Sequence, residues 1–75
     1  METEYREQYI RCGLKVQYYR KLLGLTQEAF ADKIGRSWSY VSKIESPTRV
    51  FGVSMETLFK IADALEVPVS KLFEE

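Results

Sequence analysis

Histidine is absent from the 75 residues, and cysteine and tryptophan each occur once. The chain therefore lacks the imidazole and thiolate groups that most zinc sites use, and it offers no Ser–His or Cys–His nucleophile pair. Cys12 cannot form a disulfide within the chain, so we expect a half-buried thiol in a reducing compartment. Since no secretory segment and no apolar run of membrane-spanning length are recognisable, we expect a cytoplasmic protein without a membrane partner.

Proline and glycine are also scarce, with two and four residues respectively, whereas 45% of the residues are hydrophobic. This composition is typical of an ordered globular chain. The length predicts a single domain over 1–75 with a small core, to which dimerisation or a ligand can add stability.

The charges are balanced in number but not in position. Lysine and arginine total 11, as do aspartate and glutamate. Residues 11–50 hold eight basic and three acidic residues, whereas residues 51–75 hold two basic and five acidic ones. A small domain with this distribution can offer a basic face to a polyanion while it stays neutral overall.

Hydrophobic residues recur at intervals of three and four, which predicts an all-α protein. The first expected helix carries one such stripe, which we expect to face the core, and ends at Gly24, a residue suited to a left-handed helix end. The members of this stripe are Tyr5, Tyr9, Cys12, Val16, Tyr19 and Leu23.

Capping residues predict where the next helices begin and end. Thr26 caps a second helix that ends at Gly35, and Ser37 caps a third helix that runs to about Glu45. Ser54 caps a fourth helix, whose inward residues are expected to be Met55, Leu58, Ile61, Ala62 and Leu65.

A fifth, short helix is expected after Pro68. Its apolar residues, Val69, Leu72 and Phe73, would then cover the other helices.

The second and third helices, separated by a tight glycine turn, predict a helix-turn-helix over about 26–45. Ala31 supplies a small side chain where the two helices cross, Gly35 permits the turn, and Val41 enters the core. This pattern favours DNA binding.

Residues 13–73 resemble the lambda-repressor-like, Xre-type helix-turn-helix family. The matching segments are GLKVQYYRKLLGLTQEAFADKIG, SYVSKIE and METLFKIADAL. The resemblance implies a compact five-helix DNA-binding domain whose third helix enters the major groove. It also implies an internal ion pair between Arg20 and Glu45. The chain departs from the family pattern at Ser46 and Pro47, and residues of about 1–12 extend beyond the family's usual start.

At about 100° per residue, the third helix turns Val41 inward and Ser39, Ser42 and Lys43 outward. Hydroxyls and a lysine suit base edges and phosphates. Trp38 falls between the two faces, and two interpretations of it stay open. It either covers the edge of the core or contacts DNA, with its ring on a sugar or thymine methyl and its N–H free for a phosphate.

Three further residues are candidates for phosphate contacts. Gln27 matches a family position at the start of the second helix, where a phosphate approaches. Arg36 and Arg49 flank the third helix, either as phosphate contacts or as solvated cations. The complete set predicted for DNA contact is Gln27, Arg36, Ser37, Trp38, Ser39, Tyr40, Ser42, Lys43 and Arg49.

These observations predict a sequence-specific binder of double-stranded DNA, a small transcriptional regulator that acts as a homodimer on a pseudo-palindromic operator. The alternative is a protein–protein interaction module on the same fold with little DNA affinity, which the many aromatic residues favour. Neither function needs catalytic residues, a cofactor, a metal or a small-molecule substrate. Candidates for the dimer surface are the loop at 50–53, the final helix around Leu72 and Phe73, and the tyrosine-bearing amino terminus.

Overall fold

The computed structural model describes residues 2–74, which form four α-helices, one 3₁₀ helix and no strand. The elements are α1 (Arg6–Leu22), α2 (Gln27–Ile34), α3 (Trp38–Ile44), α4 (Met55–Leu65) and η1 (Val69–Phe73). The all-α prediction is confirmed. No helix within 2–74 is long and apolar enough to cross a membrane.

The predicted fifth helix is a 3₁₀ helix rather than an α-helix. It is five residues long and follows Pro68, and the N–H of Lys71 donates to the Pro68 carbonyl at 3.0 Å. Such i→i+3 bonds are typical of short terminal helices, which cannot complete enough i→i+4 bonds to form an α-helix.

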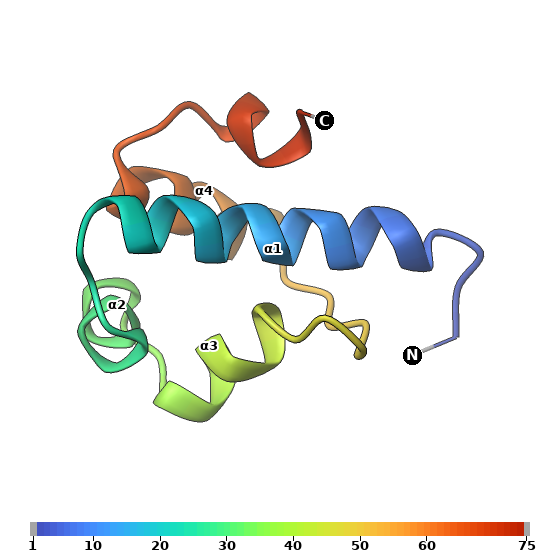
Figure 1. Cartoon of the computed structure of the whole chain (residues 1–75), viewed down its shortest axis with the longest axis horizontal. Coiled ribbons are helices and arrows are strands. Elements are labelled where there is room, and N and C mark those ends of the chain that lie inside the picture. Colours follow the sequence, from blue (N-terminus) through green and yellow to red (C-terminus); the bar gives the residue numbers. More distant parts are fainter. Residues whose placement is uncertain (1, 75) are drawn as a thin grey trace.

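The long helix α1 lies across the middle of the molecule (Figure 1). The helices α2 and α3 lie on one side of it and η1 lies on the other, with α4 behind. The described chain measures 31 × 24 × 21 Å. The pair of helices α2 and α3 and the carboxyl-terminal helix η1 are therefore on opposite sides of α1.

The predicted helix boundaries are confirmed at three amino-terminal caps. The hydroxyls of Thr26, Ser37 and Ser54 accept hydrogen bonds from the backbone N–H three residues later, at 3.0, 3.2 and 3.1 Å. Gly24 and Gly35 follow α1 and α2 with φ of 73° and 69°, a left-handed conformation that glycine adopts at little cost. Local sequence therefore sets the ends of the helix-turn-helix.

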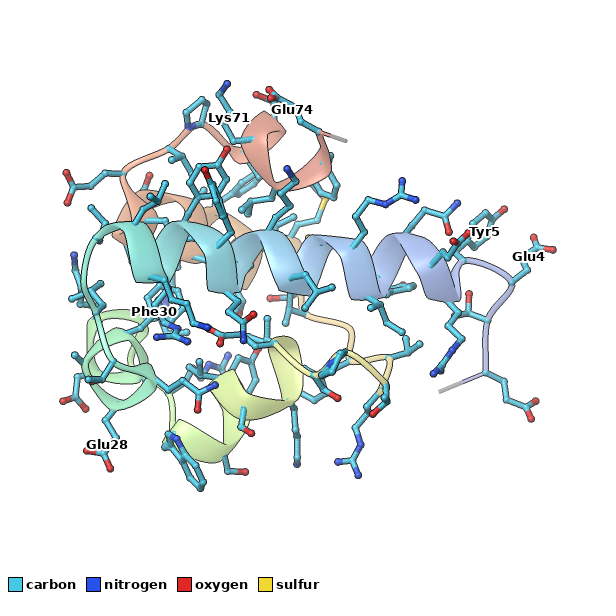
Figure 2. The ribbon with its side chains drawn as sticks, viewed as in Figure 1. Glu4, Tyr5, Glu28, Phe30, Lys71 and Glu74 are labelled. Atoms are coloured by element: carbon cyan, nitrogen blue, oxygen red, sulfur yellow. The ribbon has the colours of Figure 1, made fainter. Side chains whose placement is uncertain are left out.

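The core takes side chains from every helix. The largest fully buried ones are Phe30, Ile61, Leu65, Leu72, Val16 and Val41. Figure 2 shows Phe30 directed inward, whereas Glu28 and the Lys71–Glu74 pair lie at the outside. The predicted interior positions of the helix-turn-helix, Phe30, Ala31, Ile34, Val41 and Ile44, are all buried.

Three predicted core positions on α1 and its flanks are wrong, since Tyr5, Tyr9 and Leu23 are exposed. Tyr5 is the N-cap of α1 and Leu23 its C-cap, so both lie at the ends of this helix. Only Val16 in the middle of the stripe is fully buried.

Two further predictions of burial are wrong near the carboxyl terminus. Met55 is the first residue of α4 and Phe73 the last of η1, and both are exposed. By contrast Val50, predicted as part of a dimer surface, is buried in the segment between α3 and α4.

The sequence analysis did not identify Gly13, where α1 meets the end of α3. A Cβ atom built on Gly13 would fall far inside van der Waals distance of the Ile44 carbonyl oxygen. The two helix backbones touch at this point, so only a residue without a side chain fits.

Candidate nucleic-acid interface

The helix α3 is seven residues long, and its inner face packs into the core. Val41 and Ile44 are buried, whereas Ser39 and Lys43 are exposed and Ser42 is half-buried. The predicted outward face therefore exists, with Ser42 at its edge.

A buried ion pair joins α1 to the end of α3, as the family resemblance implies. The Arg20 Nε donates to Glu45 Oε2 at 2.7 Å, and Nη2 donates to Oε1 at 2.9 Å. Arg20 also donates through Nη1 to the Leu25 carbonyl at 2.6 Å. This bidentate geometry compensates both charges where water is excluded, which makes it a structural pair.

Hydrogen bonds extend this pair outward to the surface. Gln27 Nε2 donates to Glu45 Oε1 at 3.1 Å, and the Trp38 indole N–H donates to Gln27 Oε1 at 2.9 Å. Because both ends of the Gln27 amide are bonded, its orientation is set. The first residues of α2 and α3 are thereby held together.

Trp38 is 56% exposed, so it does not cover the edge of the core. The indole N–H is bonded to Gln27 and is not free for a phosphate, which corrects that part of the second interpretation. The ring stands outward at the amino terminus of α3, where an apolar contact is available to it.

A second cluster pairs cations with aromatic rings beside α3. Arg36 lies 4.7 Å above the Tyr40 ring, and its Nη2 donates to Thr57 Oγ1 at 3.3 Å. Tyr40 meets Phe51 edge to face at 5.1 Å, and Lys43 Nζ lies 5.9 Å from the Phe51 ring centre. These contacts favour particular positions of the two cations by about 0.5–1 kcal/mol each at an exposed site.

The structure brings eight of the nine predicted residues together on the first turn of α2, the α2–α3 turn and α3. Tyr40 is half-buried and supports Arg36, and Ser37 caps α3. Arg49 belongs to none of these elements; it is exposed in the segment between α3 and α4, where its backbone N–H donates to Ser46 Oγ at 3.1 Å. The sequence analysis missed Phe51, because no local pattern links a loop aromatic to Tyr40 and Lys43.

Outside this surface, Cys12 is half-buried, and burial raises the pKa of its thiol above the ordinary value. A raised pKa makes the thiol less reactive. Within residues 2–74, no three metal-ligating side chains cluster.

Comparison with known sequences reveals matches over most of the chain. A helix-turn-helix family model matches residues 16–72. An uncharacterised HTH-type transcriptional regulator of Sinorhizobium medicae is 33% identical over 66 residues, which is 88% of this chain and 46% of that protein. The propionyl-CoA carboxylase regulator of Cereibacter sphaeroides is 35% identical over 65 residues, 87% of this chain and 14% of that protein. The chain thus spans less than half the length of these curated relatives.

Two solved structures are similar in both sequence and fold. The restriction-modification controller protein C.AhdI from Aeromonas hydrophila is 30% identical with a TM-score of 0.83, covering 95% of this chain and 100% of that chain. The master regulator for biofilm formation SinR, crystallised in complex with DNA, is 32% identical with a TM-score of 0.75, covering 84% of this chain and 98% of that chain.

Proposed function

Because the chain belongs to the lambda-repressor-like helix-turn-helix family of transcriptional regulators, which are not enzymes, we propose that it binds specific double-stranded DNA as a homodimer. Each copy inserts α3 into the major groove of one half of a pseudo-palindromic operator. Two copies double the small number of base contacts that one such domain makes.

The observation that carries this proposal is the anchored amino-terminal edge of α2 and α3. The Trp38–Gln27 bond rests on the buried Arg20–Glu45 pair, so the exposed side chains are ordered before DNA arrives. An ordered surface loses less conformational entropy on binding.

Individual roles follow from chemistry and position. Lys43 reaches guanine acceptors or a phosphate, and Ser39 and Ser42 bond to base edges or phosphates without filling the groove. Trp38 packs its ring on a sugar or a thymine methyl. Arg36 and Arg49 contact phosphates, and Gln27 does so through its backbone N–H at the start of α2, since its side-chain amide is bonded to Glu45 and Trp38. Ser37 and Tyr40 complete the set of residues predicted for DNA contact.

Selection of bound duplexes from a random pool tests the proposal. We expect enrichment of an inverted repeat with half-sites about one DNA turn apart. Lys43→Ala should change the preferred half-site or weaken discrimination, because its side chain is exposed on the recognition face. Lys21→Ala, an exposed lysine on α1, is the matched control and should keep the preference.

Two results would contradict the proposal. If no sequence is enriched at low salt, DNA binding is not the function and the protein-interaction alternative is favoured. If Lys43→Ala and the control select the same sequences with equal discrimination, Lys43 does not specify sequence.

A further inference from the structure

Arg6 is the first residue of α1, and it bonds to a segment far along the chain. Its Nη2 donates to the Thr48 carbonyl at 2.5 Å. The helix dipole disfavours a cation at the amino terminus of a helix and favours acidic residues there. Arg6 is also the only basic residue among residues 1–10, which include three glutamates. Its place is therefore explained by the bond to Thr48 rather than by the needs of α1.

The acceptor of this bond belongs to a loop, residues 46–49, that lies between the two buried residues Glu45 and Val50. We call it the 46–49 loop. Within it, Ser46 Oγ accepts hydrogen bonds from the backbone N–H of Thr48 at 3.3 Å and from that of Arg49 at 3.1 Å. A serine hydroxyl that bonds to the backbone two and three residues later stabilises a turn. The loop therefore has a defined shape of its own.

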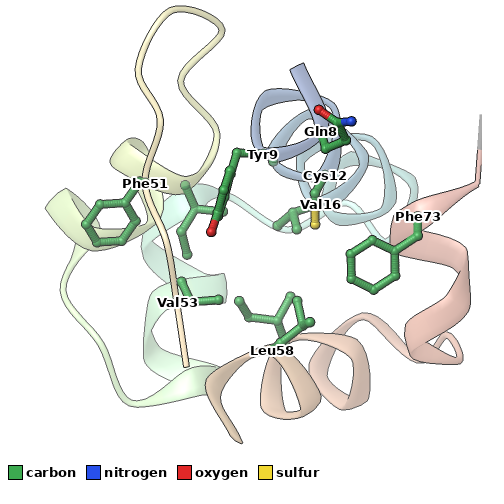
Figure 3. Close-up of a pocket in the computed structure, with 11 residues that line it drawn as sticks. Gln8, Tyr9, Cys12, Val16, Phe51, Val53, Leu58 and Phe73 are labelled. Atoms are coloured by element: carbon green, nitrogen blue, oxygen red, sulfur yellow. The ribbon is translucent and has the colours of Figure 1, made fainter. Parts of the chain in front are cut away.

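The two ends of the 46–49 loop are anchored in the molecule, and Arg6 supplies an anchor between them. Glu45 precedes the loop and forms a buried ion pair with α1. After the buried Val50, Phe51 packs edge to face on Tyr40 and forms one wall of an apolar pocket between α1, α4 and η1 (Figure 3). Exposed loops with few contacts open at little cost in free energy. The bond from Arg6 holds the exposed middle of this loop against the start of α1.

This bond involves parts of the chain that the family resemblance does not cover. The helix-turn-helix family model matches residues 16–72, so Arg6 precedes the matched region. Ser46 and Pro47, which come just before Thr48, are the positions at which the chain departs from the family pattern. A role for Arg6 must therefore be argued from the geometry of this chain.

The geometry at Arg49 is unusually well defined for an exposed loop. The Thr48 carbonyl accepts from Arg6, and the Arg49 N–H donates to Ser46. These two groups belong to the same peptide unit, so both of its polar atoms are bonded and its plane is fixed. The plane of this peptide sets the direction in which the exposed Arg49 side chain leaves the backbone. The segment after α3 lies on the same side of α1 as α3 does (Figure 1).

We infer that Arg6 is a positioning residue, which holds the Thr48–Arg49 peptide so that the Arg49 side chain is directed to the phosphate backbone beside α3. This inference rests on the proposed function, in which Arg49 contacts a phosphate. A side chain on an ordered backbone loses less conformational entropy on binding than a side chain on a mobile loop. Without Arg6, the loop has to be ordered when DNA binds, and duplex affinity falls.

A direct phosphate contact by Arg6 is the competing explanation for an effect of Arg6 on DNA binding. The three glutamates among residues 1–10 make the surroundings of Arg6 acidic, which disfavours the approach of a phosphate. One donor of its guanidinium is also occupied by Thr48. The two roles differ in a measurable way. An effect that acts through Arg49 disappears when Arg49 is removed, whereas a direct contact persists.

Duplex affinities of the full chain, Arg6→Ala, Arg49→Ala and the double variant test the inference on the selected duplex. We expect Arg6→Ala to bind about threefold more weakly for each bound copy, or about tenfold for a dimer, because the loop loses its order. In the Arg49→Ala background, Arg6→Ala should change the affinity by less than about twofold. The matched control is Lys21→Ala, which removes an exposed cation from the other end of α1 and should bind as the wild type does.

Backbone dynamics of the free protein give a second measurement that does not involve DNA. In the wild type, the NMR order parameter of the Arg49 N–H should be near about 0.85, the value of a rigid backbone. In Arg6→Ala it should fall below about 0.6. Arg6→Lys keeps a donor for the Thr48 carbonyl and should restore both the order parameter and the duplex affinity. Circular dichroism shows whether each variant is folded.

Two results overturn the inference alone when the wild type binds the duplex. The first is an order parameter of the Arg49 N–H that is the same with and without Arg6. The second is an equal loss of affinity on Arg6→Ala in the wild-type and Arg49→Ala backgrounds, which assigns a direct contact to Arg6. If the wild type binds no duplex, the proposed function fails and the positioning role in DNA binding fails with it. Duplex binding by the wild type thus distinguishes the two failures.

Discussion

The exposed indole of Trp38 is fixed by its hydrogen bond to Gln27. Trp38→Phe keeps an aromatic ring but removes the donor, which frees the Gln27 amide on that side. Since one hydrogen bond contributes about 0.5–1.5 kcal/mol, we expect a three- to tenfold loss of duplex affinity. Fluorescence anisotropy of a labelled duplex measures this loss.

The matched control is Tyr18→Phe, which changes an equally exposed ring on α1. It should bind as the wild type does. The free energy of unfolding of both variants should lie within about 1 kcal/mol of that of the wild type, because the altered groups are at the surface. Unchanged affinity in Trp38→Phe would show that the Gln27 bond does not order the interface.

Arg20 and Glu45 are both buried and bonded to one another at two points. Glu45→Leu leaves a buried guanidinium without its carboxylate, which costs about 3–5 kcal/mol of unfolding free energy. Arg20→Met combined with Glu45→Leu removes both charges, so the double variant should be more stable than Glu45→Leu alone.

Urea unfolding of the two single variants and the double variant measures the coupling. Each single variant also loses a second bond, from Arg20 to the Leu25 carbonyl or from Gln27 to Glu45. The double-mutant cycle isolates the charge pair because these separate losses cancel in it. If the loss of unfolding free energy in the double variant equalled the sum of the two single losses, Arg20 and Glu45 would not stabilise one another, contrary to the bidentate geometry.

The contact of α1 with the end of α3 depends on Gly13. Helix propensity alone predicts that Gly13→Ala stabilises α1 by about 1 kcal/mol. The clash of a Cβ with the Ile44 carbonyl acts in the opposite direction, because two backbones must separate. Since overpacking a core costs about 1–3 kcal/mol, we expect net destabilisation, measured by thermal unfolding.

Gly24→Ala provides the comparison for this substitution. Gly24 has a φ of 73° and open space around its Cβ position, so it tests backbone strain without a clash. We expect Gly24→Ala to lower the free energy of unfolding by about 1–2 kcal/mol. If Gly13→Ala raised the melting temperature, the close approach of α1 and α3 would be contradicted.

Elements whose boundaries depend on neighbouring residues could be predicted from the sequence. Thr26, Ser37 and Ser54 act within one turn of their own helix, and their caps are confirmed. Helical periodicity likewise identifies the buried face of α2 and α3, but it does not say where a neighbouring helix ends. This is why periodicity predicts Tyr5 and Met55 in the core, whereas both are exposed.

Features that join distant segments could not be predicted in this way. Gly13 meets a carbonyl far along the chain, and Phe51 contacts two side chains of α3 from a loop. For the site, angles around α3 predicted the exposure of Ser39 and Lys43. The bond between Gln27 and Trp38 depends on how two helices cross, which periodicity does not define.

The charge of the whole molecule is distributed unevenly along the chain. The basic region 11–50 contains the helix-turn-helix, whereas the segment 51–75, which contains α4 and η1, is acidic. The proposed contact with DNA therefore depends on the basic region. Salt tests this dependence, because it screens charge and displaces counterions.

We expect duplex affinity to fall steeply with salt. Arg36, Lys43 and Arg49 from each copy supply six candidate cations per proposed dimer. Release of the corresponding counterions predicts a log–log slope of about −5, or roughly a thousandfold loss of affinity between about 50 and about 200 mM salt. Fluorescence anisotropy of a labelled duplex at a series of salt concentrations measures this slope, and Arg49→Ala should reduce it by about two per dimer. A shallow slope would contradict phosphate contacts by these cations.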